Sequence, residues 1–362
     1  MHPGRWALNL AIAQRTHCGI AAELLVQVPG SHSEHLTEIE TVPVRYVAAP
    51  DKFRSATLFQ LDASRLARRA REMAPDIVHA HGTEDAYSLA AQRTGLPNVI
   101  TAQGLYFLIN RKVKLRFVSR ARAVQFTEWL AFKRARHVIA KSDYVARELK
   151  ARFPHLTLHA IPNTFDERLL RVQEAKRPNS LVFVGTISPW KGMHTIREAL
   201  IRVRDEIPDV TLDIAGDSTN SVLPYEAEQK RLLKETHGDR ITFHGQLGLI
   251  ELAQLVASSR ALVAPSLEDM FGNQLVEALL VGTQCIVAEG TALAENVRRF
   301  GNGVIIPQDD PEGLAKAIVK ALTEPTPVVK VQQARDAVAI DFGPAKVAKL
   351  HSKAYEQVLG VR

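Results

Sequence analysis

The second half of the chain contains six short apolar runs, each followed by a segment with helical spacing. Almost no polar residue interrupts these runs, which is typical of strands buried on both faces of a sheet. They are Leu181–Ile187, Val210–Gly216, Ile241–Gln246, Ala261–Ser266, Gln284–Glu289 and Gly303–Gln308. Repeated strand–helix units of this kind predict an α/β domain with a parallel, doubly wound sheet.

The first half repeats the alternation less regularly, and its length of about half of 362 residues suits a second domain. Its strand candidates are Ala22–Val28, Val44–Ala49, Asp76–Gly82, Asn98–Gly104, His137–Ser142 and Leu156–Asn163. The polar stretch Phe165–Ser180 separates the two halves. We therefore predict domains at 1–170 and 171–341, with a helix at 342–362 packing back on the first. Two such domains are expected to face a central cleft, where ligands bind at the carboxyl ends of strands.

The start of the chain has an unusual pattern for such a domain. Trp6–Gln14 already has helical spacing, and Pro3 and Gly4 stand directly before it. The first strand of the N-terminal domain is therefore expected to be missing, although the usual strand order makes that strand central. Two explanations stay open: a start codon upstream of Met1, or a compromised first domain.

Composition narrows the class of protein. Hydrophobic residues make up 46% and charged residues 23%, as in ordinary globular enzymes. The sequence shows neither a run of 18 uncharged apolar residues nor the pattern of a signal peptide. Cys18 and Cys285 lie far apart, so neither a disulfide framework nor a zinc site is expected. A cytoplasmic protein is predicted.

The net charge of +7 is concentrated in residues 105–136. This segment has one acid, Glu128, and nine basic residues: Arg111, Lys112, Lys114, Arg116, Arg120, Arg122, Lys133, Arg134 and Arg136. Large apolar residues lie between them, as in an amphipathic helix that binds the inner face of a cytoplasmic membrane. The simpler alternative is a solvated helix with a core-facing stripe. Nucleic acid is not expected, because no nucleic-acid-binding motif accompanies the charge.

Three loops after strands carry residues suited to a phosphorylated ligand. Val184–Gly192 presents a glycine-containing helix N-terminus with Lys191, which suits a diphosphate. In Pro265–Gly282, Glu277 lies within an apolar run and needs hydrogen-bond donors, such as two ribose hydroxyls. Gly290 and Thr291 form the third loop. The simpler alternatives are a tight turn with a surface lysine for the first loop, and a helix cap or salt bridge for Glu277.

Taken in order, these segments resemble family 4 retaining glycosyltransferases, which have the GT-B fold of two Rossmann-like domains. The matching segments of the second half are FVGTISPWKG, LDIAGDS, ITFHGQL, APSLEDMFGNQLVEALLVG and EGTALAENVRRFGNGVIIPQDDPEGLAKAI. In the first half, DIVHAHGTEDAYSLAAQRTGLPNVITAQG and KSDYVARELKARFP resemble the acceptor domain, and FGPAKVAKLHSKAYEQVL resembles the closing helix. The resemblance covers nearly the whole chain.

The resemblance implies roles for individual residues. Glu277 matches the acid that holds the ribose, Asp269 matches the acid that contacts the transferred sugar, and Lys191 matches the diphosphate lysine. The other residues implied on the donor side are Gly185, Thr186, Phe271, Gly272, Asn273, Gly290 and Thr291. Asp269, Lys191 and Gln103 are the expected catalytic residues.

On the acceptor side, the resemblance assigns Gly4 to the end of a glycine-rich loop. His81, at a strand end, is expected to line the cleft with Glu84, and we expect His79 and His81 to face opposite sides of their strand. The sequence departs from the family where Thr186 replaces Arg, Gln103 replaces His and Asp269 replaces Glu.

The predicted function is a metal-independent transfer of a sugar, with retention, from a UDP-sugar or GDP-sugar to an acceptor hydroxyl. The acceptor is expected to be a sugar or a lipid-linked molecule, as in polysaccharide or glycolipid synthesis. Two alternatives stay open: a catalytically weakened paralogue that only binds nucleotide sugars, and a nucleotide-sugar epimerase of the same fold.

Overall fold

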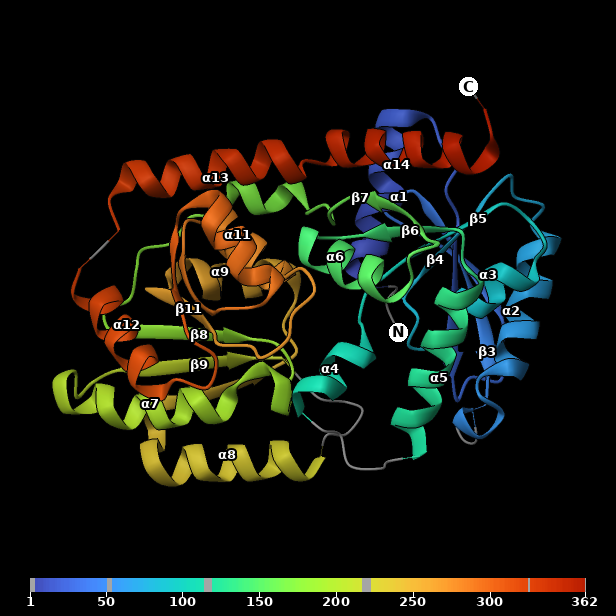
Figure 1. Cartoon of the computed structure of the whole chain (residues 1–362). Helices are drawn as coiled ribbons and strands as arrows, with labels where there is room; N and C mark the ends of the chain where they lie inside the picture. Colours follow the sequence, from blue (N-terminus) through green and yellow to red (C-terminus); the bar gives the residue numbers. More distant parts are fainter. Residues whose placement is uncertain (1–3, 51–53, 114–118, 217–222, 325, 362) are drawn as a thin grey trace. The chain divides into compact units, whose positions relative to one another are not determined.

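The protein divides into two compact α/β units, which are described separately (Figure 1). The computed structural model describes residues 4–50, 54–113, 119–216, 223–324 and 326–361. Unit 1 consists of Met1–Thr164 and Phe342–Arg362, and unit 2 consists of Phe165–Asp341. The predicted domain border after residue 170 falls inside unit 2, in the short helix η2 (Glu167–Arg171).

Unit 2 is built on one parallel sheet of six strands in the order β10-β9-β8-β11-β12-β13. The strands are β8 (Ser180–Val184), β9 (Thr211–Ala215), β10 (Ile241–Gly245), β11 (Ala261–Ala264), β12 (Gln284–Ala288) and β13 (Gly303–Ile306). Every pairing in this sheet is parallel. All six predicted apolar runs form strands, because a strand covered on both faces can bury every side chain.

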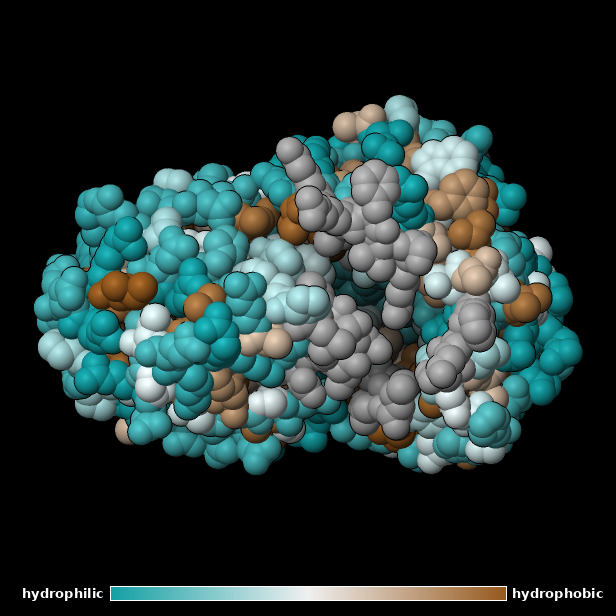
Figure 2. Space-filling view, turned by 90° about the horizontal axis from the view of Figure 1, so that it is seen from below, coloured by the Kyte–Doolittle hydropathy of each residue, from teal (hydrophilic) through white to brown (hydrophobic). Residues whose placement is uncertain are grey.

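Helices cover both faces of this sheet. They are η2, η3 (Pro189–Lys191), α7 (Met193–Glu206), α8 (Leu223–His237), η4 (Gly238–Arg240), α9 (Leu249–Ser258), α10 (Asn273–Leu280), α11 (Ala292–Phe300), α12 (Pro311–Thr323) and α13 (Val328–Phe342). Apolar side chains of α7 and α12 pack with those of β8 and β9 in one core cluster. Hydrophilic side chains dominate the face of this unit that is visible in Figure 2.

Unit 1 contains two separate sheets where the sequence predicted one. The first has the order β1-β3-β2 and the second the order β4-β5-β6-β7. The strands are β1 (Leu24–Pro29), β2 (His35–Ile39), β3 (Val42–Ala49), β4 (Val78–His81), β5 (Asn98–Thr101), β6 (His137–Ala140) and β7 (Thr157–Ala160). In the described part of the chain, no strand joins β1 to β4, so these two strands form the edges of their sheets.

The sequence analysis did not predict the strand β2, which pairs antiparallel with β3. The two strands are joined at Glu40 and Thr41, whose φ angles are 48° and 73°. Positive φ at both central residues is the conformation of a tight hairpin turn, for which Asn and Gly are the usual residues. Since this turn has neither, the sequence pattern did not reveal the hairpin.

The helices of unit 1 include the C-terminal helix of the chain. They are α1 (Arg5–Cys18), η1 (Ser55–Thr57), α2 (Gln60–Glu72), α3 (Tyr87–Arg93), α4 (Tyr106–Val113), α5 (Ser119–Arg134), α6 (Asp143–Arg152) and α14 (Pro344–Leu359). Helix α14 packs against α1 (Figure 1), and Gln14 Nε2 donates a 2.8 Å hydrogen bond to Tyr355 Oη. Among the helices described, none is long and apolar enough to cross a membrane.

The basic segment 105–136 forms most of α4 and α5, while Lys114 and Arg116 lie outside the described residues. Helix α5 buries Val124, Glu128 and Phe132. Phe126 and Trp129, which are 46% and 37% exposed, lie on its other side. The helix therefore has a core-facing stripe and, in addition, exposed aromatic side chains.

Candidate functional site

Three loops at the carboxyl edge of the unit 2 sheet are connected to one another by hydrogen bonds. These are the loops after β8, β11 and β12, which carry the predicted donor-binding residues. Leu267 N donates to Trp190 O at 2.8 Å, which connects the first two loops. Ala292 N donates to Asp269 O at 3.0 Å, and Asn296 Nδ2 donates to Phe271 O at 2.9 Å. The three loops therefore form one structural element.

Glycine is required at two positions where these loops lie close together. Gly192 has a φ of 74°, and a Cβ added there would collide with Pro265 O. Gly272 has a φ of 82°, and its added Cβ would lie against Leu293. Positive φ favours glycine, and the neighbouring atoms leave no room for a larger residue. The glycines thus allow α7 and α10 to begin close to the adjoining loops.

Lys191 and Asp269, both predicted to be catalytic, form an ion pair. Lys191 Nζ lies 2.6 Å from Asp269 Oδ2, and the two side chains are 19% and 7% exposed. Asp269 also accepts hydrogen bonds from Gln274 Nε2 at 3.0 Å and Phe271 N at 3.2 Å. Burial favours the protonated acid, but the Lys191 ammonium and these donors outweigh it and lower the pKa of Asp269. Asp269 is therefore a charged carboxylate in a confined site.

Glu277 lies on α10, which begins at Asn273 directly after Gly272. Its side chain is half-buried, whereas the neighbouring Val276 and Ala278 are buried. Glu268, the acid that the sequence did not select, is 1% exposed and is more deeply buried than Asp269. Both acids of this loop are therefore buried, and sequence spacing could not reveal the small difference between them.

The remaining donor-side residues flank these loops. Gly185 follows β8 with a φ of 144°, and Thr186 beside it is exposed. Thr291 is the N-cap residue of α11 and donates its hydroxyl to Ala288 O at 3.2 Å. Gly290 has a φ of 73° and lies near the side chain of Gln308. The structure therefore brings the predicted donor-side residues of unit 2 to one edge of its sheet.

In unit 1, the predicted residues His81 and Gln103 lie side by side at the carboxyl ends of β4 and β5. Gln103 Nε2 is 3.3 Å from His81 Nδ1, and Gln103 Oε1 accepts a 2.7 Å hydrogen bond from Lys141 Nζ. Lys141 is 7% exposed and follows β6 directly. Sequence reasoning missed Lys141, although a lysine immediately after a buried strand was a usable signal.

The expectation that His79 and His81 face opposite sides is wrong. Their rings stack with centroids 4.1 Å apart. Residues two positions apart in a strand lie on the same face, so the expectation misapplied the period of a strand. His79 Nδ1 lies 2.7 Å from Tyr355 Oη, and His79 Nε2 lies 2.6 Å from Thr101 Oγ1. These contacts join α14 to the strands of unit 1.

The histidines of this cluster are held in the neutral form. Loss of solvation, with the charges of His351 and Lys141, lowers the pKa of His81 to about 3. Loss of solvation also lowers the pKa of His351 to about 4 and that of His79 well below its usual range. Neutral imidazoles can donate and accept hydrogen bonds but carry no charge near neutral pH.

Glu84 is enclosed between two glycines of unit 1. Its carboxylate accepts a 2.8 Å hydrogen bond from Thr83 N. A Cβ added to Gly82 or Gly104 would collide with this carboxylate. Loss of solvation raises the pKa of Glu84. Gly4, the remaining acceptor-side residue, is the N-cap of α1 and lies against the ring of Trp6.

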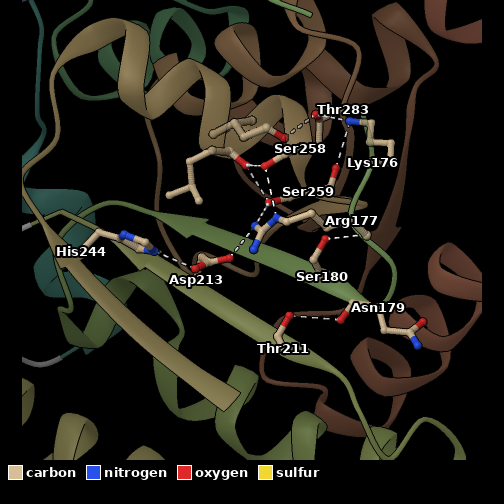
Figure 3. Close-up of polar contacts among 12 residues, drawn as sticks. Lys176, Arg177, Asn179, Ser180, Thr211, Asp213, His244, Ser258, Ser259 and Thr283 are labelled. Atoms are coloured by element: carbon tan, nitrogen blue, oxygen red, sulfur yellow. Dashed lines mark hydrogen bonds and ion pairs between the residues drawn. The ribbon is translucent and has the colours of Figure 1, made fainter. Parts of the chain in front are cut away.

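A second polar cluster of unit 2 lies around the start of β8 (Figure 3). Arg177 Nη2 donates to Asp213 Oδ2 at 2.6 Å, and His244 Nε2 lies 2.6 Å from Asp213 Oδ1. Lys176 Nζ donates to Thr283 Oγ1 at 2.7 Å, and burial lowers the pKa of this lysine to about 8. These contacts connect the segment before β8 with β9, β10 and the segment before β12. We interpret the cluster as structural, since it includes none of the predicted site residues.

Among the described residues, no group of three or more His, Cys, Asp and Glu side chains could hold a metal ion.

Asn296 and Gln274 are further residues that the sequence did not single out. Asn296 is buried and holds the loop carbonyl of Phe271, whereas Gln274 holds the carboxylate of Asp269. Polar residues within a helix carry no sequence signal for such contacts.

Two family descriptions match the two halves of the chain. Residues 4–169 match "Glycosyltransferase Family 4", and residues 178–324 match "Glycosyl transferases group 1". The glycogen synthase of Mycobacterium tuberculosis is 32% identical over 180 residues, which cover 49% of this chain and 42% of that protein. The D-inositol 3-phosphate glycosyltransferase of Jonesia denitrificans is 25% identical over 268 residues, covering 68% of this chain and 63% of that protein. The matches thus span less than two thirds of the length of these relatives.

Solved structures show the same fold over nearly the whole chain. Sucrose-phosphate synthase from Thermosynechococcus elongatus superposes with a TM-score of 0.82 at 20% identity, covering 99% of this chain and 94% of that one. The Anabaena protein HepE in complex with UDP-glucose gives a TM-score of 0.72 at 19% identity, covering 98% and 97%. The fold is GT-B, with two Rossmann-like α/β domains.

Proposed function

The chain belongs to the group 1, family 4 glycosyltransferases, and on this premise we propose that it transfers a sugar, with retention, from a nucleoside-diphosphate sugar to an acceptor hydroxyl. The observation that carries the proposal is the confined ion pair of Lys191 and Asp269 in the connected loops of unit 2. An ionised carboxylate there offers an acceptor for sugar hydroxyls, and the ammonium offers a charge for a phosphate.

The proposed donor is a UDP-sugar or a GDP-sugar. Glu277 suits the two ribose hydroxyls, because it lies half-buried on α10 close to the loop of Asp269. The N-terminus of α10 at Asn273 and the turns at Gly185 and Gly290 suit the diphosphate. The structure of HepE with UDP-glucose, a protein of the same fold, favours a uridine nucleotide.

Catalysis would depend mainly on positioning and on stabilising the leaving group. In the proposed step, the bond between the sugar carbon and the diphosphate oxygen breaks as the acceptor oxygen bonds to the same face of that carbon. The departing diphosphate takes the proton of the acceptor hydroxyl. Lys191 stabilises the charge that develops on the diphosphate, while Asp269 holds the lysine and a sugar hydroxyl. No protein nucleophile is required.

Unit 1 would bind the acceptor. We assign Gly4, His81 and Glu84 to the acceptor side, and Gln103 to a hydrogen bond with the transferred sugar. Neutral His81 and Lys141 both contact Gln103, so the orientation of its amide is determined. The proposed acceptor is a sugar or lipid-linked molecule of polysaccharide or glycolipid synthesis, reached at an anionic membrane surface through segment 105–136.

The test is to measure binding and turnover with a panel of nucleotide sugars. Glu277→Gln should weaken nucleotide binding by about 10-fold to 100-fold, since it removes a charged hydrogen-bond acceptor. Glu312→Gln is the matched control, because Glu312 is exposed and pairs only with Lys316 on the surface of α12 among the contacts described. Full transfer activity of Glu277→Gln with every nucleotide sugar would overturn the assignment of this residue.

The same panel separates the alternatives. Nucleotide binding without hydrolysis or transfer in any assay would favour a weakened paralogue. An epimerised sugar released in the absence of an acceptor would favour an epimerase. Transfer to an added acceptor, with the anomeric configuration of the donor kept, is the result expected here.

A further inference from the structure

The carboxyl edge of the sheet β4-β5-β6-β7, which carries His81 and Gln103, has acids of the chain at its backbone N–H groups. At the beginning of α4, Tyr106 N and Phe107 N donate to the two oxygens of Glu128, at 2.8 Å and 3.0 Å. Glu128 comes from α5 and is 1% exposed. The N-terminus of a helix is a common binding site for anions. At α4, a buried carboxyl group of the chain takes that place.

The helix that follows β4 has a similar arrangement. Directly before α3, Ala86 N donates a 2.7 Å hydrogen bond to Asp85 Oδ1. The same oxygen accepts a 2.6 Å hydrogen bond from Arg54 Nη2, and Arg54 Nε donates to Asp62 Oδ2 at 2.7 Å. Two acids of the chain thus compensate the charge of Arg54, which leaves little attraction for an added anion.

A third acid, Glu84, lies against N–H groups of the loops after β4 and β5. Thr83 N donates to Glu84 Oε2 at 2.8 Å. Loss of solvation raises the pKa of Glu84, whereas its own N–H, the charge of Lys141 and the N–H groups of Thr83 and Gly104 act against this rise. The Lys141 ammonium also donates to Gln103 O at 3.0 Å and to Gln103 Oε1 at 2.7 Å. These groups therefore already have a carboxylate of the chain beside them.

Gly104 shows that the loop after β5 is shaped around the Glu84 carboxylate. The φ angle of Gly104 lies outside the left-handed region, so its backbone does not by that angle require glycine. The three atoms nearest to a Cβ added there all belong to Glu84, and Oε1 would collide with it. A Cβ added to Gly82 would collide with Oε2. The two glycines thus leave room for an anion, as they do in backbone sites for phosphate.

The three connected loops of unit 2 differ in this respect. Gly192 and Gly272 are the N-cap residues of α7 and α10, and glycine has no side chain that could cap a helix. Thr291, the N-cap residue of α11, donates its hydroxyl to Ala288 O and makes no cap hydrogen bond. None of these three helices is therefore capped by the side chain of its N-cap residue. This suits the proposed binding of a diphosphate at unit 2.

We propose that Glu84, together with Asp85 and Glu128, makes this edge of unit 1 select an acceptor that is uncharged around its reacting hydroxyl. The inference rests on the proposed function and specifies the acceptor of that reaction. A phosphate or carboxylate beside the reacting hydroxyl would meet N–H groups that are already occupied, and the Glu84 carboxylate would repel it. The phosphate of a lipid-linked acceptor therefore has to lie away from this edge.

The first test detects the anion site by amide hydrogen exchange, without a donor or an acceptor. Glu84→Ala removes the carboxylate, and sodium formate is the probe that replaces it. Formate should slow the exchange of the Thr83 and Gly104 amides at least about 5-fold in this variant, and should not slow it in the unchanged protein. Glu38→Ala, at an exposed position of β2, is the control and should also show no effect. A folded Glu84→Ala variant that formate does not protect would overturn the proposal.

The second test measures kcat/KM for pairs of acceptors, each pair a sugar and its phosphate monoester. The unchanged protein and Glu38→Ala should favour the uncharged member at least about 100-fold, and Glu84→Ala should reduce this preference at least about 10-fold. Glu84→Gln, which keeps the volume and removes the charge, should reduce it as well and replaces Glu84→Ala if that variant does not fold.

A preference of the unchanged protein for the phosphorylated member would overturn the proposal. Transfer to no acceptor at all would instead contradict the proposed function. The formate measurement would then still decide whether Glu84 fills an anion site, because it requires neither substrate.

Discussion

Lys191 Nζ lies 2.6 Å from Asp269 Oδ2, although 78 positions separate these residues in the chain. The pair connects the loop after β8 with the loop after β11. It confines the two charges that the proposed reaction needs, a cation for the leaving diphosphate and an anion for the sugar. Its stability and its chemistry can therefore be tested together.

Removal of either partner should destabilise unit 2. Lys191→Met leaves Asp269 charged and nearly buried, which should lower the free energy of unfolding by about 3 kcal/mol. The double variant Lys191→Met, Asp269→Asn should lose less free energy of unfolding than the two single variants lose together, as measured by denaturant unfolding. Both single variants should also lose most of the transfer activity.

The pair of Lys316 and Glu312 is the matched control, since it has the same N–O distance of 2.6 Å but lies on the surface. Its double-mutant cycle should give only a small coupling that added salt removes. Equal coupling energies for the two pairs would contradict the view that burial makes the Lys191–Asp269 contact strong.

Gly192→Ala should destabilise unit 2 much more than Gly238→Ala. Both glycines have positive φ, 74° and 58°, so both alanines are strained. Only at Gly192 does the new Cβ collide with a backbone atom, Pro265 O, whereas no atom lies within 4 Å at Gly238. We expect Gly192→Ala to lower the free energy of unfolding by more than about 1 kcal/mol beyond the effect of Gly238→Ala. Similar midpoints of thermal unfolding for the two variants would disprove this explanation.

The neutral histidines of unit 1 should make its stability sensitive to acid. The pKa values of His81 and His351 in the folded protein are about 3 and 4, below the usual 6.5. The unfolded chain therefore binds more protons as the pH falls below 6.5, and stability is lost at roughly 1 kcal/mol per pH unit for each histidine. His351→Gln should flatten this decline between pH 7 and pH 5 in urea unfolding.

Glu128 contributes to the pH dependence of stability with the opposite sign. Burial raises its pKa to about 8, so the folded protein holds the extra proton between about pH 4.5 and pH 8. Its stabilising contribution is complete below the unfolded pKa and is lost as the pH rises through about 8. The contribution of Glu128 is the same in His351→Gln and in the unchanged protein, so it cancels when the two are compared. If the stability of both proteins fell equally with acid, His351 would not be the cause of the acid sensitivity.

The exposed aromatic residues of α5 should mediate binding to anionic vesicles. Phe126 and Trp129 are partly exposed, and Lys133 Nζ lies 4.7 Å from the centroid of the Trp129 ring. Sedimentation with phosphatidylserine vesicles should therefore decrease with added salt and with Phe126→Ser combined with Trp129→Ser. Val328→Ser, at a site 82% exposed in unit 2, is the control. No binding at low salt would leave α5 as an ordinary solvated helix.

The strands of unit 2 were predictable from the sequence, because a strand buried on both faces must be apolar along its length. The loops that carry Lys191, Asp269 and Gly290 were predictable for a related reason, since ligand-binding residues follow the strands of such sheets. The strand β2 was not, because its turn at Glu40 and Thr41 has none of the residues that mark a hairpin. The stacking of His79 on His81 was also missed, because we expected residues two positions apart in a strand to face opposite sides, whereas they lie on the same face.

The sequence by itself determined the alternation of strands and helices, the family and the candidate residues, because these depend on local patterns and on the order of motifs. Only the tertiary structure decided that Lys191 pairs with Asp269, that Lys141 holds Gln103, and that β1 and β4 lie in separate sheets. These relationships join residues far apart in the chain. They depend on which strand edges and loops the packing brings within hydrogen-bonding distance, and no local pattern encodes such a distance.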